Sequence, residues 1–256
     1  MGGKSIRMRK TAITITMISI FSWLGVSGAQ AQINLNPEFG SALYAPFTVF
    51  SPDADKPENY ADEILLVFHG MMSAVPNGTY KRLRKRLRKH MTVIGINYHP
   101  FKAEETKQFL DRVAEIHCRG KKVTVLGTSF GSFWARYFAA KIKAHRLVMI
   151  NPIIDVQSRI KLWVGTERFN TRRNENVTIS ASSFQGYDSI PTRYEDHPKS
   201  LVVLTADDKI GTPRATKQYF SGAPNVEIAW YESGGHTINL KKHPALDRIV
   251  LFLAPR

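Results

Sequence analysis

The sequence has a single cysteine, Cys118, among its 256 residues. One thiol excludes an intramolecular disulfide and a cysteine-rich metal site. The histidines show neither the H-x-x-H nor the H-E-x-x-H spacing that metal hydrolases use, so we expect no metal ion. Cys118 ends a polar helical stretch with no histidine motif around it, which favours a partly buried free thiol over a nucleophile.

Acidic residues are scarce relative to basic ones. The chain has 21 Asp and Glu against 36 Lys and Arg, and its formal net charge is +15. This balance favours contact with anionic surfaces such as phospholipid headgroups or acidic polysaccharide, but a solvated basic face explains it equally well. No recognised nucleic-acid-binding module accompanies the charge, so we expect no nucleic-acid partner.

Long apolar runs are also absent, and the most apolar stretch lies near the N-terminus. Residues 11–26 carry no charge but are short for a membrane span of about 20 residues. Four basic residues precede them, and Ala29-Gln30-Ala31 follows, as in a secretory signal peptide. We therefore expect a signal peptide over residues 1–31, with Gln32 as the new N-terminus, rather than an uncleaved anchor. Cleavage would lower the net charge to +11 and place the protein in the periplasm or outside the cell.

The remaining chain, residues 32–256, alternates short apolar runs with helical patterns and contains no repeat. The expected strands are Ile64–Phe68, Thr92–Asn97, Val123–Leu126, Arg146–Ile150, Leu201–Thr205 and Val226–Trp230. The expected helices are Tyr80–His90, Ala103–His117, Phe130–Lys141, Pro213–Phe220 and Pro244–Leu253. Nearly continuous Val, Ile and Leu runs are typical of strands buried on both faces. The pattern predicts an α/β domain with a mostly parallel central sheet and helices on both faces.

One interval breaks this spacing. Residues 152–199 separate two strands, are largely polar and carry scattered aromatic residues. Long insertions in compact domains are usually lids or surface excursions. We expect a short cap-like insertion lying over the carboxyl ends of the strands, where ligands bind in this architecture.

The strongest chemical signal is the segment Gly127-Thr128-Ser129-Phe130-Gly131. It fits the G-x-S-x-G pattern, and it directly follows one expected strand and precedes a helix, which is the context that the pattern requires. The glycines avoid clashes that any Cβ would cause in the strained turn, which projects the serine hydroxyl above the sheet. We therefore predict that Ser129 is a nucleophile rather than a helix-capping serine.

A nucleophilic serine needs a base, and the base needs an acid that orients it. In proteins with this kind of turn, the three residues follow one another along the chain in the order serine, acid and histidine, so the histidine comes last. His236 fits, because it follows the last expected strand in Gly234-Gly235-His236. Asp208 follows the preceding strand and is the favoured acid on loop register, with Asp207 capping the turn. Asp207 itself and Asp155, which follows an earlier strand, remain alternatives.

Acyl transfer also needs hydrogen-bond donors for the developing oxyanion. The backbone amide of Phe130, next to the nucleophile, is one expected donor. The other is the amide of Met71 in the turn His69-Gly70-Met71-Met72, where Gly70 allows the backbone to approach the substrate. We expect His69 to brace this turn.

Taken together, these segments resemble the α/β-hydrolase superfamily over essentially all of the chain after residue 31. Within it, the chain is similar to the small bacterial YqiA/YcfP-like esterases. The matching segments are His69-Gly70, the serine turn Gly127–Gly131 (the elbow) followed by Ser132-Phe133-Trp134-Ala135, Leu147–Pro152, Val202–Thr205 with Asp207-Asp208, and Gly234-Gly235-His236. The resemblance implies carboxylesterase or thioesterase activity on a small-molecule or lipid acyl ester, through a covalent acyl-enzyme and without a cofactor.

Three functions are consistent with these sequence features. The first is the serine carboxylesterase, and the second is a thioesterase, lipase or peptidase that uses the same residues, because a fold does not settle a substrate. The third is a non-catalytic, hydrolase-like binder of anionic envelope polymers. Residues 81–90, of which all but Leu83 and Leu87 are basic, predict either a solvated helix or peripheral contact with an anionic membrane or polysaccharide.

Overall fold

The structure is a computed structural model that describes residues 44–51, 56–191 and 198–254. The predicted signal peptide over residues 1–31 lies outside these ranges. Among the helices of the described ranges, none combines the length and the apolar character that crossing a membrane requires.

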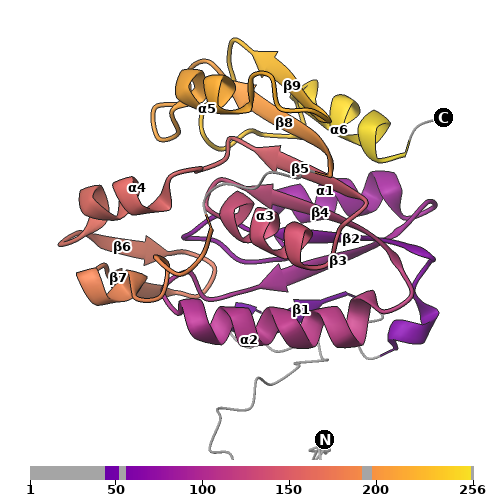
Figure 1. Ribbon diagram of the computed structural model, residues 1–256, viewed down its shortest axis with the longest axis horizontal. Coiled ribbons are helices and arrows are strands. Elements are labelled where there is room, and N and C mark those ends of the chain that lie inside the picture. The colour runs from indigo at the N-terminus through magenta and orange to yellow at the C-terminus, as the bar shows by residue number, and fades with distance from the viewer. Residues whose placement is uncertain (1–43, 52–55, 192–197, 255–256) are drawn as a thin grey trace, which may run out of the picture. The chain divides into compact units, whose positions relative to one another are not determined.

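A seven-stranded sheet forms the centre of the described chain, in the order β1-β3-β2-β4-β5-β8-β9. All neighbouring strands are parallel except β1, which pairs antiparallel with β3 at one edge. The strands are β1 (Thr48–Phe50), β2 (Glu63–Phe68), β3 (Thr92–Asn97), β4 (Lys122–Thr128), β5 (Arg146–Ile150), β8 (Lys199–Thr205) and β9 (Val226–Tyr231). The predicted mostly parallel sheet is confirmed, and Figure 1 shows its strands side by side.

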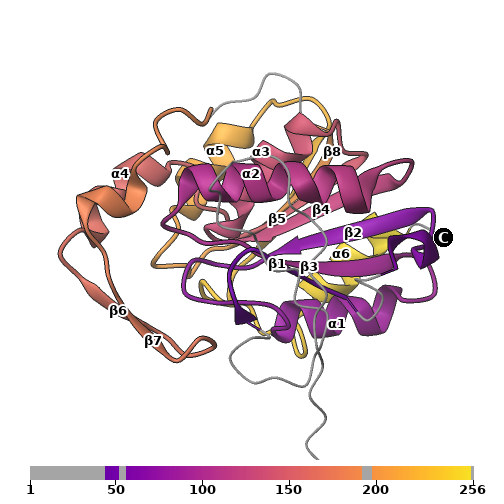
Figure 2. The ribbon, with the colours of Figure 1, turned by 90° about the horizontal axis from the view of Figure 1, so that it is seen from below.

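Helices cover both faces of this sheet. Figure 2 shows α1 and α6 on one face and α2, α3 and α5 on the other. Their bounds are α1 (Gly78–Leu87), α2 (Ala103–Val113), α3 (Gly131–Lys141), α5 (Pro213–Phe220) and α6 (Ala245–Leu253), and a π-helical turn (Ala114–Cys118) continues α2. Successive β2 residues alternate between the two cores, because side chains along a strand point to opposite faces: Leu66 packs with the α2 and α3 side, and Leu65 with the α1 and α6 side.

The insertion over residues 152–199 contains α4 (Val156–Trp163), the antiparallel hairpin of β6 (Glu167–Asn170) and β7 (Glu175–Thr178), and a 3₁₀ turn (Ala181–Phe184). In Figure 2 the hairpin extends away from the central sheet. The side chain of Arg173, in the turn between the two strands, is almost fully buried and reaches back to the rest of the chain. Its Nε donates to the Tyr44 carbonyl at 2.9 Å and its Nη2 to the Tyr98 carbonyl at 3.0 Å. This one side chain therefore ties the hairpin to the segments around the central sheet.

Helix α1 is the basic helix of the sequence. Its buried residues are Tyr80, Leu83 and Leu87, which form one apolar stripe because residues three and four apart share a helix face. Most of its basic side chains are exposed, and Arg86 pairs with Asp247 of α6 at 2.8 Å. Contact with an anionic surface through this helix remains a prediction.

Candidate active site

Ser129 lies in the turn between β4 and α3 with a φ of +54°, a left-handed conformation that is rare for residues other than glycine. Its amide donates to the Ile150 carbonyl at 2.8 Å. A Cβ on Gly127 would lie 2.5 Å from the carbonyl oxygen of Gly131, and one on Gly131 would lie 2.7 Å from that of Phe68. The two glycines are therefore required, because the turn packs directly against neighbouring backbone.

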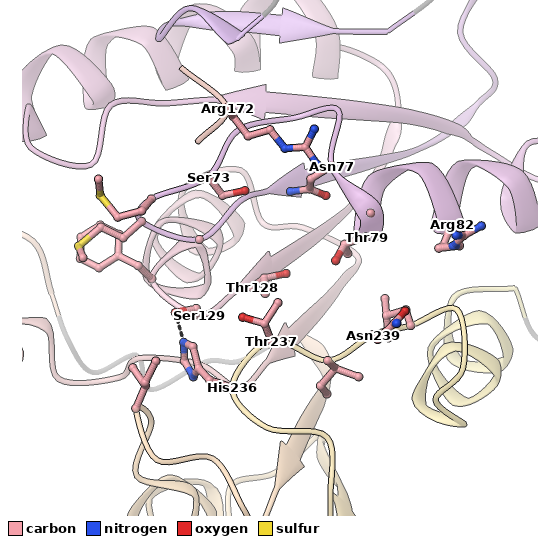
Figure 3. A pocket seen from close by; sticks show the side chains of 18 of the residues that line it. Ser73, Asn77, Thr79, Arg82, Thr128, Ser129, Arg172, His236, Thr237 and Asn239 are labelled. Atoms are coloured by element: carbon pink, nitrogen blue, oxygen red, sulfur yellow. Dashed lines mark hydrogen bonds between the residues drawn. The ribbon is translucent and has the colours of Figure 1, made fainter. Parts of the chain in front are cut away.

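The hydroxyl of Ser129 meets His236 at the carboxyl edge of the sheet. Ser129 Oγ lies 2.6 Å from His236 Nε2, and His236 Nδ1 lies 2.8 Å from Oδ2 of Asp208. Because an ionised carboxylate only accepts hydrogen bonds, Nδ1 carries the proton and Nε2 is free to accept the serine proton. In Figure 3 the imidazole of His236 points toward Ser129, and a dashed line marks their hydrogen bond. The structure thus brings the three predicted residues into one hydrogen-bonded chain.

The environment of Asp208 keeps its carboxylate ionised. The side chain is almost fully buried, and burial raises its pKa. The hydrogen bonds from His236 and from the backbone amide of Gly211, at 2.8 Å, outweigh that effect and hold the pKa of Asp208 below its ordinary value. A carboxylate that accepts several hydrogen bonds stays ionised when it is buried, and it can therefore accept the Nδ1 proton of His236.

The two other candidate acids take different places. The Asp207 carboxylate binds the backbone amide of Gly235 at 2.8 Å and does not contact the imidazole of His236. Asp155 accepts from the amide of Ser158 at 2.9 Å in the first turn of α4. The geometry therefore leaves Asp208 as the acid beside the histidine, as the loop register predicted.

Asn151 is a supporting residue to which the sequence assigned no role. It is buried at the end of β5 with a φ of +42°. Its Nδ2 lies 2.8 Å from the carbonyl oxygen of Gly235 and 3.1 Å from that of His236, while its Oδ1 accepts from the Thr205 amide at 3.0 Å. It therefore fixes the backbone of His236 relative to β5 and β8. The Asn-Pro pair after a strand was the only sequence signal for it.

The expected oxyanion loop runs beside the serine. A Cβ on Gly70 would lie 3.6 Å from Cβ of Ser129, so the loop and the elbow are in close contact. Met71 and Phe130 both line the pocket that contains Ser129. Among the described residues, neither backbone amide donates a hydrogen bond to another group. Both amides therefore lack an acceptor within the described chain, as the expected oxyanion donors would.

His69 is buried behind this loop. Its Nδ1 donates to the Gly70 carbonyl at 2.6 Å, and its ring stacks on Tyr98 with 4.4 Å between centroids. Burial, together with the nearby charge of Arg173, lowers the pKa of His69 to about 3. The ring is therefore neutral at ordinary pH and fits the predicted bracing role.

A pocket of about 730 Å³ opens above Ser129 and His236. Part of its wall is apolar: Met71, Met72, Phe130, Trp163, Ile210, Ile238 and Leu240. The rest includes the start of α1 and four cationic side chains, Arg82, Arg168, Arg172 and Lys241, which the sequence did not single out for the site. Within the described ranges, no group of three His, Cys, Asp or Glu side chains is placed to hold a metal ion.

Comparison with protein families finds one matching family model, described as an uncharacterised protein family (UPF0227), over residues 64–254. This match covers most of the chain and includes all three residues of the hydrogen-bonded chain. A comparison with curated proteins finds no match.

Solved structures with the same fold include several hydrolases. Est1E from Butyrivibrio proteoclasticus has a TM-score of 0.59 at 11% identity, covering 75% of this chain and 85% of its own. A monoacylglycerol lipase from Paleococcus ferrophilus has a TM-score of 0.57 at 14% identity, covering 75% and 95%. A structure from the metagenome-derived lipolytic enzymes LipS and LipT has a TM-score of 0.56 at 15% identity, covering 76% and 94%. At these identities the likeness shows the fold alone, and the predicted α/β-hydrolase fold is confirmed.

Proposed function

The chain belongs to the uncharacterised protein family UPF0227, and we propose that it is a serine hydrolase that cleaves an acyl ester. Ser129 is the nucleophile, His236 the general base and acid, and Asp208 the residue that orients the histidine. The observation that carries this proposal is the pair of contacts at His236, 2.6 Å to Ser129 Oγ and 2.8 Å to Asp208 Oδ2. A histidine joined in this way to a hydroxyl and a buried carboxylate can activate the hydroxyl.

Acylation begins when Ser129 Oγ attacks the ester carbonyl carbon and its proton moves to His236 Nε2. The carbonyl oxygen becomes an oxyanion, which the amides of Phe130 and Met71 stabilise. Each such donor typically contributes about 3 kcal/mol in the transition state. The carbon–oxygen bond to the alcohol then breaks, and His236 returns the proton to the departing alcohol oxygen. The product is an acyl group bound to Ser129.

Deacylation reverses these roles with water as the attacking group. His236 takes one proton from the water while the water oxygen attacks the acyl carbon. The bond to Ser129 Oγ then breaks, and His236 gives that proton back to the serine oxygen. One ester and one water thus yield one carboxylic acid and one alcohol, and the side chains return to their starting state.

The pocket supports an acyl substrate over a peptide. Its apolar wall combines two methionines, aromatic rings and aliphatic side chains, which suit a hydrocarbon chain of variable shape. Similar structures include proteins described as lipolytic enzymes and as a monoacylglycerol lipase, and we extend ester chemistry to this chain by analogy. A thioesterase or lipase with the same three residues is the second candidate, and substrate screening separates the two.

The direct test is hydrolysis of 4-nitrophenyl esters from acetate to palmitate, with a matched acyl-thioester series. Purified wild-type protein should release nitrophenol, and Ser129→Ala should lower kcat by about 10⁴-fold or more. Faster turnover of thioesters would make the protein a thioesterase. No turnover of either series would favour a hydrolase-like binder and contradict the proposal.

The proposal extends to export, on the strength of the N-terminal sequence. The basic residues, the uncharged stretch over residues 11–26 and Ala29-Gln30-Ala31 together favour cleavage after Ala31. Mass spectrometry of the protein from its native source should find Gln32, free or cyclised, at the N-terminus. A cytoplasmic product that begins at Met1 would contradict export.

A further inference from the structure

The charges around the pocket are of one sign. Four of the described residues that line it are cationic: Arg82, Arg168, Arg172 and Lys241. No Asp or Glu is among the described residues that line the pocket. The four cationic residues come from α1, from β6, from the turn of the hairpin and from the segment before α6. Within the described residues, none of the four forms an ion pair. Four unpaired cations converging on one cavity favour an anionic ligand.

We propose that the ester cleaved at Ser129 carries a second, anionic group of the phosphate or carboxylate type, and that this basic wall binds it. The inference rests on the proposed function, and it adds the substrate class. The apolar wall would hold the hydrocarbon part, while the basic wall would hold the charged part. Figure 3 shows the geometry, with Ser129 and His236 on one side of the pocket and Arg82 on the other.

Arg172 is held in place by its surroundings, although its side chain is exposed. Its amide and that of Arg173 both donate to Oδ1 of Asn170, at 3.1 and 3.2 Å, which fixes the turn. The adjacent Arg173 is anchored to the carbonyls of Tyr44 and Tyr98. The guanidinium of Arg172 lies over the ring of Tyr44, 5.8 Å from its centroid. Its Nη1 also donates to the Tyr44 hydroxyl at 3.5 Å. The fixed turn and the contacts with Tyr44 restrict the side chain, so it loses less conformational freedom when it binds an oxyanion.

The start of α1 adds to the same field. Asn77 caps the helix by accepting from the Tyr80 amide at 3.0 Å, and Gly78 and Thr79 of the first turn line the pocket. This first turn contains no acidic residue. The positive end of the helix dipole therefore points toward the cavity that Arg82, one turn further along, also lines. Arginine forks and helix starts both match the oxygens of phosphate and carboxylate groups.

Two pairs of soluble esters test the proposal and separate the two kinds of anion. The first pair is hexanoyl-glycerol phosphate against hexanoyl-glycerol, and the second is 4-nitrophenyl hydrogen succinate against 4-nitrophenyl butyrate. At low ionic strength the wild-type protein should have a kcat/KM at least about tenfold higher for the anionic member of one pair or both. High salt should reduce that ratio, because it screens exposed charges. Equal kcat/KM within both pairs would overturn the proposal.

Matched variants locate the effect. Arg82→Gln and Arg172→Gln should each lower the anionic-to-neutral ratio by about tenfold. Arg84→Gln is the control, because it removes the same charge from the same helix at an exposed position outside the pocket. If Arg84→Gln lowered the ratio as much as Arg82→Gln, net charge rather than the basic wall would be responsible, and the proposal would fail.

A binding measurement separates this inference from the proposed function. Isothermal titration calorimetry of Ser129→Ala should show tighter binding of hexanoyl-glycerol phosphate than of hexanoyl-glycerol, and Arg82→Gln in the same background should abolish the difference. This result without wild-type turnover would overturn the hydrolase and leave the anion site standing. Turnover of neutral and anionic esters alike, with no difference in binding, would overturn the anion site alone.

Discussion

Asp207 and Asp208 hold one loop by two different groups. The carboxylate of Asp208 lies 2.8 Å from Nδ1 of His236, while that of Asp207 lies 2.8 Å from the backbone amide of Gly235. Asp207 is exposed, and the hydrogen bond from Gly235 holds its pKa below the ordinary value. Adjacent aspartates at the end of β8 thus fix both the ring of the histidine and the backbone that carries it.

This division of roles predicts that the two aspartates are not equivalent. Asp208→Asn should lower kcat by about 10⁴-fold, because an amide in that place stabilises the wrong histidine tautomer and no imidazolium. Asp207→Asn should lower kcat far less, by about tenfold. The carboxylate accepts from the amides of Gly235 and Gly234, and the asparagine oxygen still accepts from one of them. Steady-state kinetics on a short nitrophenyl ester measures both variants. A larger decrease in kcat for Asp207→Asn than for Asp208→Asn would identify Asp207 as the acid.

The close packing of the elbow predicts a stability effect at Gly131. Its added Cβ would overlap the backbone of β2 and the following turn, so Gly131→Ala should lower the free energy of unfolding by about 1–3 kcal/mol. Gly78→Ala is the control, because nothing lies within 4 Å of a Cβ placed there. Thermal unfolding compares the two. An unchanged Tm for Gly131→Ala would show that the elbow is looser than described.

Buried histidines predict a loss of stability in mild acid. Burial lowers the pKa of His117 to about 4, and that of His69 to about 3 with help from Arg173. In the unfolded chain histidine has a pKa of about 6.5, so below that pH the unfolded state binds more protons. The contribution to stability is complete above about pH 6.5 and is lost progressively as the pH falls toward 4. Urea unfolding between pH 5 and 7 should show this decline.

A single histidine variant checks the assignment. His117→Phe keeps a ring against Tyr60 but cannot be protonated, so its unfolding free energy should fall less steeply, by up to about 1.4 kcal/mol per pH unit. His90→Gln is the control, because the His90 side chain is exposed. Equal slopes for wild type and His117→Phe would assign the acid sensitivity to other groups.

The exposed basic surface of α1 and of the turn that follows it is the basis of the membrane prediction. Arg84, Lys85, Arg88 and Lys89 are exposed and lie outside the pocket. Near an anionic surface each can contribute about 1 kcal/mol, and salt screens the effect. The protein should co-sediment with anionic vesicles at low salt and release at high salt. Changing the four residues to Glu should remove this binding while hydrolysis of a neutral soluble ester continues. Binding to neutral vesicles with equal strength, or to neither kind, would leave α1 as solvated surface.

Apolar runs and the serine turn predicted the buried strands and the three residues around Ser129, because short stretches of sequence determine these features. The expected strands Thr92–Asn97 and Arg146–Ile150 coincide with β3 and β5, because both are nearly continuous apolar runs. The three residues of the hydrogen-bonded chain were found from the elbow and the order of elements. β1 was missed, since three residues at a sheet edge show no periodicity, and so was the β6–β7 hairpin, whose strands are mostly exposed.

The basic wall could not be predicted from sequence, because its members meet only after folding. Arg172 and Arg173 are indistinguishable neighbours in the sequence, yet one lines the pocket and the other is a buried anchor. Arg82 was one of many basic residues on a helix whose outer face is solvated. Asn151 likewise gains its role from the approach of the His236 loop, which lies about 85 residues further along the chain.

The central claim is that His236 and Asp208 activate Ser129 as a nucleophile, and active-site labelling with a fluorophosphonate tests it most directly. The probe reacts with an activated serine hydroxyl, and mass spectrometry of the digested protein identifies the residue that carries it. The account predicts one probe per chain on Ser129, none in Ser129→Ala, and labelling at least about 10³-fold slower in His236→Ala. Absence of the adduct from Ser129, or labelling at the same rate without the histidine, would contradict it.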